Sequence, residues 1–197
     1  MPIKYSGHQW MSTAKPINFN NSITVEAIFD VDDKGNCPTL ICMPETQKWK
    51  LPIYRLGLHK KTGKPEFQIL LEDQREAISV VYGKEVEYKK LMHMAGTYDG
   101  EKAILYVDGK EVAHQSKHGT IAQSKEPVIF GGRSKTDEGG FFIGSMYELR
   151  LMSCVRTPEE IDFWSHKQMP SPKEVKDWKM TNPPVKEGEL QGLWRAW

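Results

Sequence analysis

Residues 91–112 of the chain read LMHMAGTYDGEKAILYVDGKEV, and this stretch decides the fold. It sets two Asp-Gly pairs, Asp99-Gly100 and Asp108-Gly109, between segments rich in apolar and aromatic residues. Asp-Gly is a strong β-hairpin signal, because a type I′ turn needs positive φ at both central residues and these residue types tolerate it. The stretch therefore predicts three consecutive antiparallel strands.

Short strands continue on both sides of this stretch. Their spacing of about 8 to 12 residues is typical of a sandwich or barrel rather than of alternating strands and helices. Residues 141–152 form a long alternating run and are predicted to be a central strand, with Met146, Glu148 and Arg150 on the face opposite Leu149 and Leu151. Further strands are predicted at residues 23–29, 39–43, 52–59, 66–71, 78–82, 86–91, 110–115 and 127–131.

One short helix is predicted after the last long strand. Thr157 is placed to cap it, Pro158 occupies its first position, and Glu160 completes a capping box. The helix is expected near residues 158–167, because it must end before Pro170.

Both ends of the chain are expected to lie on one domain. Residues 1–22 are polar and irregular, with Trp10 and Phe19 as anchors to a core. Residues 169–189 carry four prolines and many charges, which favours an extended surface strap. The aromatic segment 190–197 alternates, and our hypothesis is that it pairs as a strand with the N-terminal region. We therefore expect one β-sandwich or barrel over residues 1–168, with the strap and final strand of residues 169–197 packed on the same domain.

Composition excludes several classes of protein. The 197 residues include 27 basic and 26 acidic ones, for a formal net charge of +1, so no global field attracts nucleic acid or an anionic membrane. No apolar run approaches the roughly 20 residues of a transmembrane helix. The first six residues lack the apolar core of a secretory signal, so the chain is either cytoplasmic or cut from a longer precursor. Cys37, Cys42 and Cys154 form no Cys-x-x-Cys pair, which leaves zinc-ribbon and thioredoxin-like folds without support.

Five segments carry a resemblance to a known family. They are residues 23–27 (Ile-Thr-Val-Glu-Ala), 93–100, 105–109 (Leu-Tyr-Val-Asp-Gly), 142–151 and 157–161. In this order and spacing the chain resembles the concanavalin A-like lectin/glucanase superfamily, and within it the laminin G-like and pentraxin-like jelly rolls. The resemblance implies an all-β, antiparallel two-sheet β-sandwich and an extracellular or cell-surface location. The fold hosts lectins, adhesion modules and glucanases, so it does not by itself choose a function.

No catalytic residue is predicted. The segment 160–165 imitates the Glu-x-Asp-x-x-Glu signature of the glucanases in this superfamily, whose chemistry needs two carboxylates on one strand. Here Ser165 replaces the last carboxylate, and the capping box places the segment on a helix. The leading interpretation is a non-catalytic binding or adhesion module that recognises carbohydrate or a protein surface through loops at one end of the sandwich. A glycoside hydrolase, which would need paired acids on an open concave sheet, and a structural or assembly component remain the alternatives.

Candidate binding residues follow from two kinds of chemistry. Sugars stack on exposed aromatic rings, which points to Trp10, Trp49 and Tyr54 as ligand-binding residues. Calcium takes carboxylate oxygens, and analogy with the family suggests a Ca²⁺ site at Asp30, Asp32 and Asp33, with Asp137 and Glu138 as a second possibility. The chain has Met146-Tyr147-Glu148 where many members of the family carry Ile-Asp-Glu, so an acidic residue of the family pattern is missing.

Overall fold

The computed structural model describes residues 2–33, 38–44, 51–72, 74, 76–133, 140–165 and 167, together with the backbone of residues 190–195. Over these residues the chain forms thirteen strands and one helix. In chain order they are β1 (Ile3–Ser6), β2 (Met11–Ser12), β3 (Ile23–Val31), β4 (Thr39–Pro44), β5 (Pro52–Leu58), β6 (Pro65–Ile69), β7 (Ile78–Val81), β8 (Met92–Tyr98), β9 (Lys102–Val107), β10 (Lys110–Ser116), β11 (Ile129–Phe130), β12 (Ile143–Met152), α1 (Pro158–Trp164) and β13 (Leu190–Arg195).

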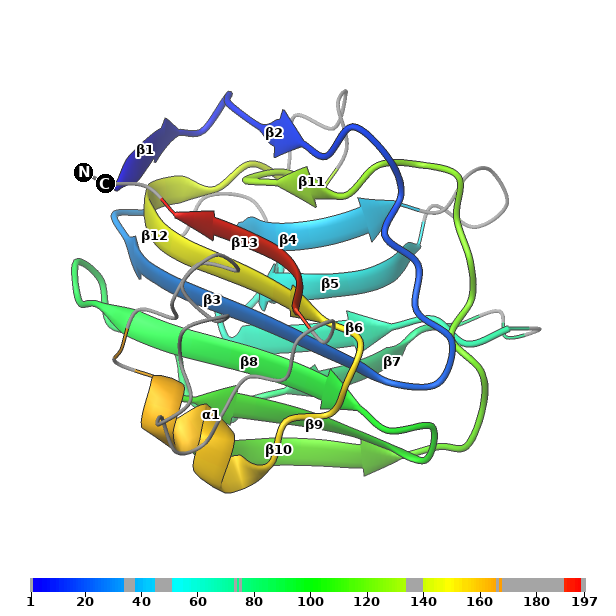
Figure 1. The fold of residues 1–197 in the computed structure, drawn as a ribbon. Helices are drawn as coiled ribbons and strands as arrows, with labels where there is room; N and C mark the ends of the chain where they lie inside the picture. Colours follow the sequence, from blue (N-terminus) through cyan, green and yellow to red (C-terminus); the bar gives the residue numbers. More distant parts are fainter. Residues whose placement is uncertain are drawn as a thin grey trace, which may run out of the picture.

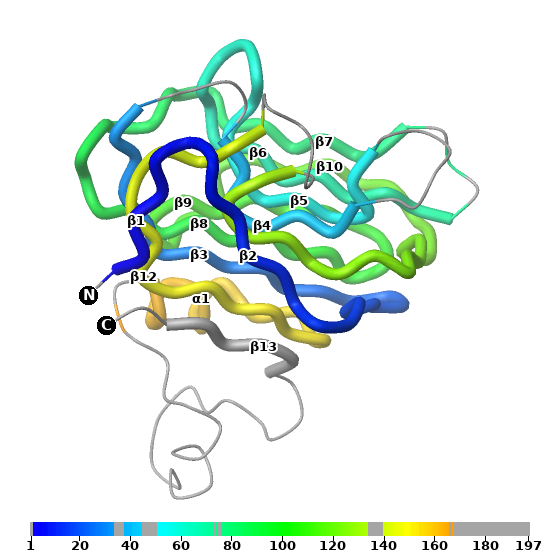
Figure 2. Tube along the Cα trace, turned by 90° about the horizontal axis from the view of Figure 1, so that it is seen from above, coloured from blue at the N-terminus to red at the C-terminus, as the bar shows by residue number. Residues whose placement is uncertain are grey.

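The strands form two antiparallel sheets packed face to face (Figure 1). The seven-stranded sheet, sheet A, has the order β1-β12-β3-β8-β9-β10, with β13 also paired to β12. The six-stranded sheet, sheet B, has the order β2-β11-β4-β5-β6-β7. Seen from above, the two sheets form two layers and α1 lies on the outer side of sheet A (Figure 2). The predicted all-β sandwich with one short helix is confirmed.

The second Asp-Gly pair forms the predicted turn. Asp108 and Gly109 have φ values of 47° and 81°. The flanking residues Val107 and Lys110 pair with each other. Two positive φ angles in a two-residue loop agree with type I′ geometry, which matches the twist of the strands that it joins.

The first Asp-Gly pair forms a different turn. Only Gly100 has positive φ there. The Asp99 carboxylate caps the turn instead, because its Oδ1 accepts hydrogen bonds from the backbone N–H groups of Glu101 at 2.8 Å and Lys102 at 2.6 Å. The side chain of Asp99 thus replaces part of the backbone pairing, as aspartate often does in turns. Strands β8, β9 and β10 still follow one another as predicted.

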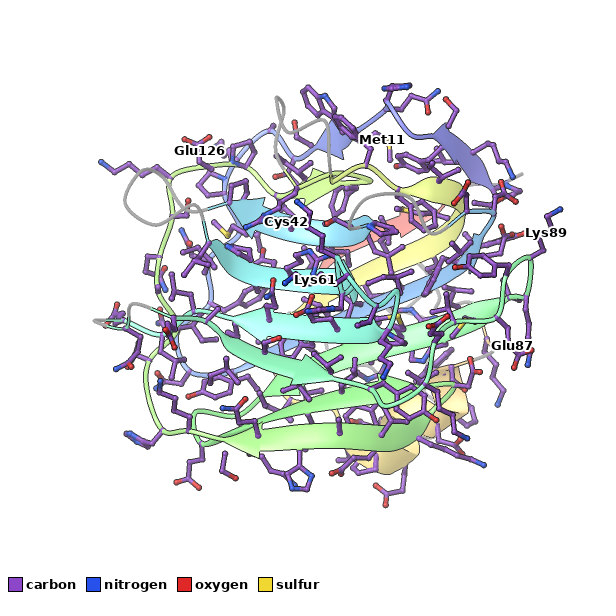
Figure 3. All side chains as sticks on the ribbon, turned by 180° about the vertical axis from the view of Figure 1, so that it is seen from behind. Met11, Cys42, Lys61, Glu87, Lys89 and Glu126 are labelled. Atoms are coloured by element: carbon purple, nitrogen blue, oxygen red, sulfur yellow. The ribbon has the colours of Figure 1, made fainter. Side chains whose placement is uncertain are left out.

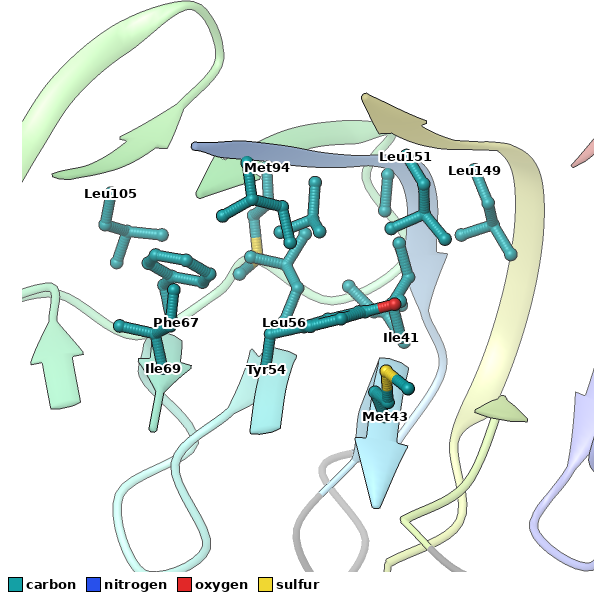
Figure 4. Close-up of a cluster of buried hydrophobic side chains, with 14 of the residues drawn as sticks. Ile41, Met43, Tyr54, Leu56, Phe67, Ile69, Met94, Leu105, Leu149 and Leu151 are labelled. Carbon is teal, nitrogen blue, oxygen red and sulfur yellow. The ribbon is translucent and has the colours of Figure 1, made fainter. Parts of the chain in front are cut away.

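Apolar side chains from the inner faces of both sheets make a continuous core (Figure 4). A Cβ atom at Gly96 of β8 would lie 2.3 Å from the ring of Phe67 on β6, so this glycine allows the two sheets to approach closely. The side chains that meet in Figure 4 are Ile41, Met43, Tyr54, Leu56, Phe67 and Ile69 from sheet B and Met94, Leu105, Leu149 and Leu151 from sheet A.

Strand β12 has partners on both edges, as expected of a central strand. One edge pairs with β3. The other edge is shared, because β1 pairs with the first part of β12, from Ile143 to Met146, and β13 with the last part, from Glu148 to Met152. The hypothesis that residues 190–197 pair with the N-terminal region is therefore wrong about the partner. The N-terminal strand covers only the start of that edge, which leaves the rest to β13.

A bulge in β12 changes which side chains face the core. The register against β3 shifts between Met146 and Glu148. Met146, Leu149 and Leu151 therefore all belong to the core cluster. The prediction that Met146 faces away from Leu149 and Leu151 is wrong, because strict alternation does not reveal an extra residue in a strand.

Two connecting segments also differ from expectation. Residues 86–91 form no strand; they belong to the connection from β7 to β8, in which Val86 is buried and the N–H of Lys89 donates to the carbonyl of Val31 at 2.7 Å. Residues 1–22 are not wholly irregular, because they contain β1 and β2. Of their two predicted anchors, Phe19 is buried and Trp10 is half-buried.

The helix begins as predicted and ends earlier. The side chain of Thr157 accepts from the backbone N–H of Glu160, and the Glu160 carboxylate accepts from the N–H of Thr157 in return. The helical residues are Pro158–Trp164, with Ser165 as the C-cap. Ile161 packs on Ala95 on the outer face of sheet A. No helix in the described part of the chain combines the length and the apolar content needed to cross a membrane.

Candidate binding surface

Two connections that cross between the sheets lie against each other. The β1–β2 connection, residues 7–10, runs from sheet A to sheet B, and the β11–β12 connection runs back from sheet B to sheet A. A Cβ atom at Gly7 would lie 3.1 Å from the side chain of Ile143, and one at Gly131 would lie 2.2 Å from the ring of Tyr5. The absence of side chains at these glycines allows each connection to pack closely on a strand beside the other connection, Gly7 on β12 and Gly131 on β1.

Three ring side chains gather where these connections meet, and we call His8, Trp10 and Phe141 the aromatic cluster. The ring centroids of His8 and Phe141 are 6.4 Å apart. Gly132 lies between the other two, because its Cβ would be 3.1 Å from the Phe141 ring and 3.5 Å from Cβ of Trp10. His8 is exposed, and Trp10 and Phe141 are half-buried. The aromatic cluster therefore presents ring surface to solvent.

The aromatic cluster stands on a packed base. Phe142 is buried and meets Tyr5 and Phe29 edge-to-face, at centroid distances of 5.9 Å and 6.0 Å. Successive residues in an extended chain point to opposite sides, so seating Phe142 in the core turns Phe141 outward. The β1–β2 connection is fixed by the Gln9 side chain, whose Oε1 accepts from the backbone N–H of Ser6 at 2.6 Å.

The structure separates the three predicted sugar-binding residues. Trp10 belongs to the aromatic cluster. Tyr54 is fully buried, packs edge-to-face on Phe19 at 5.6 Å and donates its hydroxyl to the carbonyl of Ile17 at 2.9 Å, so no face of its ring is open to a sugar. Trp49 lies outside the described residues. Phe141 was not predicted as a candidate, although two successive phenylalanines at the start of a strand place one ring on each side.

The predicted calcium ligands already have partners within the chain. The hydroxyl of Tyr147 donates to Oδ2 of Asp30 at 2.8 Å. This hydrogen bond, together with burial, raises the pKa of Tyr147. Asp32 forms an ion pair with Lys4. The part of the chain that the structure describes contains no group of three or more His, Cys, Asp or Glu side chains arranged to hold a metal ion. Calcium binding at Asp30, Asp32 and Asp33 stays a prediction, and Asp137 and Glu138 lie outside the described residues.

Five buried polar side chains form a charge cluster between α1 and the outer face of sheet A. Arg150 donates from Nη1 to Oε2 of Glu26 at 2.5 Å and from Nε to Oε1 of Glu148 at 2.6 Å. Arg156 donates to Oε1 of Glu26 at 3.2 Å. His93 completes the set, with its Nε2 at 3.3 Å from Oε2 of Glu26. Burial works to raise the pKa of Glu26, but the two guanidinium groups and His93 bring it far below its usual range.

Figure 3 views the molecule from the side of sheet B, and the outer face of this sheet carries a second buried ion pair. Arg55 donates from Nη1 to Oε2 of Glu66 at 2.7 Å, and the hydroxyl of Ser79 donates to the other oxygen of Glu66 at 2.6 Å. One row across this face consists of Cys42, Arg55, Gln68 and Ser79, on β4 to β7. This row is neither acidic nor aromatic. It therefore lacks both the carboxylate pair of a glycosidase and a ring on which a sugar could stack.

The segment that imitates the glucanase signature serves the helix. The carboxylate of Glu160 accepts from the backbone N–H of Thr157 at 2.9 Å, which is a capping role. Asp162 is exposed, and its Oδ1 would lie 2.6 Å from a Cβ atom at Gly109. Because one carboxylate caps the helix and the other lies against a turn, the segment has the structural role that the sequence predicts.

The molecule is thus a sandwich of two packed sheets, with the aromatic cluster as a candidate binding surface at its edge. The sequence model of the concanavalin A-like lectin/glucanases superfamily matches residues 6–162, and the chain belongs to this superfamily. The resemblance stated from the sequence is thereby confirmed. No curated protein matches the chain.

Several solved structures have the same fold as this chain. A putative carbohydrate binding protein from Bacteroides ovatus is 19% identical over 99% of this chain and 52% of that chain, with a TM-score of 0.70. A sialidase CBM40 from Ruminococcus gnavus bound to α2,3 sialyllactose is 12% identical over 83% of this chain and 95% of its own, with a TM-score of 0.65. Domains LG4-5 of the mouse laminin α1 chain are 16% identical over 75% of this chain and 40% of theirs, with a TM-score of 0.60. At these identities the likeness concerns the fold.

Proposed function

We propose that this chain is a non-catalytic module that binds carbohydrate at the aromatic cluster of His8, Trp10 and Phe141. The observation that carries the proposal is the pair of half-buried rings, Trp10 and Phe141, that flank Gly132 at the surface. The apolar C–H face of a pyranose ring stacks on such rings, and polar groups beside them orient its hydroxyls. The exposed imidazole of His8 provides a polar group at this position.

Rigid support favours this surface over the other loops. The backbone beneath the rings is fixed by the packing of Phe142 in the core and by the Ser6–Gln9 hydrogen bond. A ligand that meets preordered rings spends less free energy on immobilising side chains. The names of the neighbouring structures, a carbohydrate binding protein and a sialidase CBM40, support a sugar ligand.

A protein ligand is the second candidate. Tyr88 and Leu91, in the β7–β8 connection, are 41% and 49% exposed, and they are two of the three large apolar side chains that the structure places at the surface in its described part. Exposed apolar side chains that lie close together in a loop are a feature of protein interfaces. The neighbouring laminin domains have the same fold.

Glycan-array screening followed by calorimetry with Trp10→Ala and Phe141→Ala tests the proposal. Both variants should bind the identified oligosaccharide at least about tenfold more weakly, which corresponds to about 1.4 kcal/mol. Phe163→Ala is the matched control, because Phe163 is also a half-buried ring but lies on α1. An array without any bound glycan, or equal affinity for all variants, would refute the assignment.

A further inference from the structure

Arg150 of β12 donates hydrogen bonds to two backbone carbonyls at the end of helix α1. Arg150 donates from Nη1 to the carbonyl of Trp164 at 3.2 Å and from Nη2 to the carbonyl of Lys167 at 2.7 Å. These carbonyls lie at the end of the helix and just beyond it, where backbone oxygens lack partners within the helix. The position of the helix end therefore depends on how firmly the Arg150 side chain is held.

Two carboxylates hold Arg150 in place, and their charges are balanced. Glu26 and Glu148 bind Arg150, and Arg156 binds the second oxygen of Glu26. The guanidinium of Arg156 also lies 6.0 Å from the ring centre of Trp164. Two negative and two positive charges thus sum to zero when His93 is neutral. This balance makes a buried cluster tolerable, because an uncompensated buried charge is costly.

His93 is the member of the charge cluster that can upset this balance near neutral pH. It is fully buried, and its Nε2 faces the Glu26 oxygen that also receives Arg150. Its Nδ1 has no hydrogen-bond partner among the described residues. Protonation would add a third positive charge and a buried N–H donor without an acceptor. Both changes are unfavourable in a site from which water is excluded.

The groups around His93 offer little compensation. From the β9–β10 turn, Oδ1 of Asp108 already accepts the backbone N–H of His93 at 2.9 Å. From α1, the Asp162 carboxylate lies against Gly109 of the same turn and is exposed to solvent. Strand β9 contributes Tyr106, which packs with Ile161 of the helix. The remaining charges that face His93 are the two glutamates and two arginines of the charge cluster.

We propose that His93 is a pH-sensitive latch, whose protonation loosens the charge cluster and releases α1 from the outer face of sheet A. Release would expose the apolar surface that Ile161 covers on Ala95 and Tyr106. The helix opens more readily than the sandwich, because α1 has only seven residues and buries only Ile161 and Trp164, whereas the main core lies between the sheets.

The direction of the pH effect follows from burial. Burial lowers the pKa of His93 below its ordinary value of 6.5, against the opposing effect of Glu26. The closed state then binds fewer protons than the open state, so acid favours opening. The latch is closed above about pH 6.5 and loosens as the pH falls from 6.5 through the lower pKa of the closed state. The arginines remain charged throughout this range.

Hydrogen exchange measured by mass spectrometry at pH 7.5 and 5.5, corrected for intrinsic rates, tests the latch. In the wild-type chain the equilibrium constant for opening of residues 158–165 should increase as the pH falls. The increase is at most tenfold for each unit by which the pKa of His93 in the closed state lies below 6.5. Peptides from β4 and β5 should not change. His93→Gln should remove the pH dependence of the helix, and His114→Gln, at an exposed position, should keep it.

The proposal would be overturned if the protection of α1 did not depend on pH. It would also be overturned if His93→Gln lost protection at pH 5.5 to the same extent as the wild type. If His93→Gln fails to fold, NMR titration of the wild-type imidazole decides the question. A His93 midpoint below 6.5 that is shared by the amide signals of α1 supports the proposal. A midpoint at or above 6.5, or helix signals that do not follow it, overturns it.

Discussion

The guanidinium of Arg150 meets the carboxylate of Glu26 at 2.5 Å, although 124 residues separate them in the chain and neither side chain is exposed. The pair joins β12 to β3 on the outer face of sheet A. It also directs Arg150 toward the end of α1. Because each charge is tolerable in the interior only while the other is present, this contact is the most sensitive point of the outer face.

Replacing Glu26 by Gln should destabilise the fold strongly. The amide keeps the shape but leaves Arg150 and Arg156 without their shared charge, and breaking a buried pair in this way costs about 3–5 kcal/mol. Urea denaturation followed by circular dichroism measures the loss. Glu87→Gln is the control, because both Glu87 and its partner Lys90 are exposed, and ion pairs at the surface contribute little to stability. Equal losses in the two variants would contradict the assigned role of Glu26.

The lowered pKa of Glu26 also predicts that the fold loses stability in acid. The pKa of Glu26 is lower in the folded chain than its ordinary value of 4.5, so the folded state binds fewer protons than the unfolded state. Its contribution to stability is complete above pH 4.5 and is lost progressively below it. The free energy of unfolding, measured by urea titration between pH 7 and pH 3, should fall steeply below 4.5 in the wild type and less steeply in Glu26→Gln. Parallel curves for the two proteins would count against the prediction.

Gly109→Ala should destabilise the fold through the turn and the helix together. Gly109 has φ of 81°, and an added Cβ would lie 2.8 Å from Cα of Asp162 in α1. Positive φ at a residue other than glycine costs about 1–3 kcal/mol, before any displacement of the helix. Gly83→Ala is the matched control, because nothing lies within 4 Å of its Cβ position and the change should stay within about 0.5 kcal/mol. Thermal melting compares the two, and an unchanged Gly109→Ala midpoint would be inconsistent with this packing.

Calcium titration tests the metal prediction at Asp30, Asp32 and Asp33. Binding there requires Asp32 to leave Lys4 and Asp30 to release the hydroxyl of Tyr147. Lys4→Ala should therefore increase any calcium-dependent rise of the melting temperature, and Asp32→Asn should reduce it. A melting temperature that does not respond to millimolar calcium after chelation would end the prediction.

Local patterns predict this architecture well where the chain obeys simple periodicity. The β8–β10 meander and the capping box at Thr157 follow from turn chemistry and alternation, whereas the two-sheet arrangement was implied by the family resemblance. The face of β12 on which Met146 lies and the strand that pairs with β13 do not follow from these patterns. A bulge adds one residue without a compositional signal, and the free edge of β12 is divided by β1, which the polar N-terminal sequence does not suggest.

The candidate site is predictable only in part. Trp10 and Tyr54 were selected on the same ground, that sugars stack on exposed aromatic rings, but Trp10 is half-buried whereas Tyr54 belongs to the core. His8 and Phe141 gather beside Trp10 because two connections that are distant in the sequence meet there, which local patterns do not reveal. The buried charge cluster was also unforeseen, since Glu26 and Glu148 occupy positions that alternation assigns to a solvent-facing side and α1 then covers them.

The most direct test of carbohydrate recognition is NMR chemical-shift mapping of the isotope-labelled chain during titration with the oligosaccharide selected on the array. The account predicts that the amide and side-chain signals perturbed first belong to residues 7–10, 131–133 and 140–142 around Trp10 and Phe141. Perturbations confined to the outer face of sheet B, around Gln68 and Ser79, would contradict it.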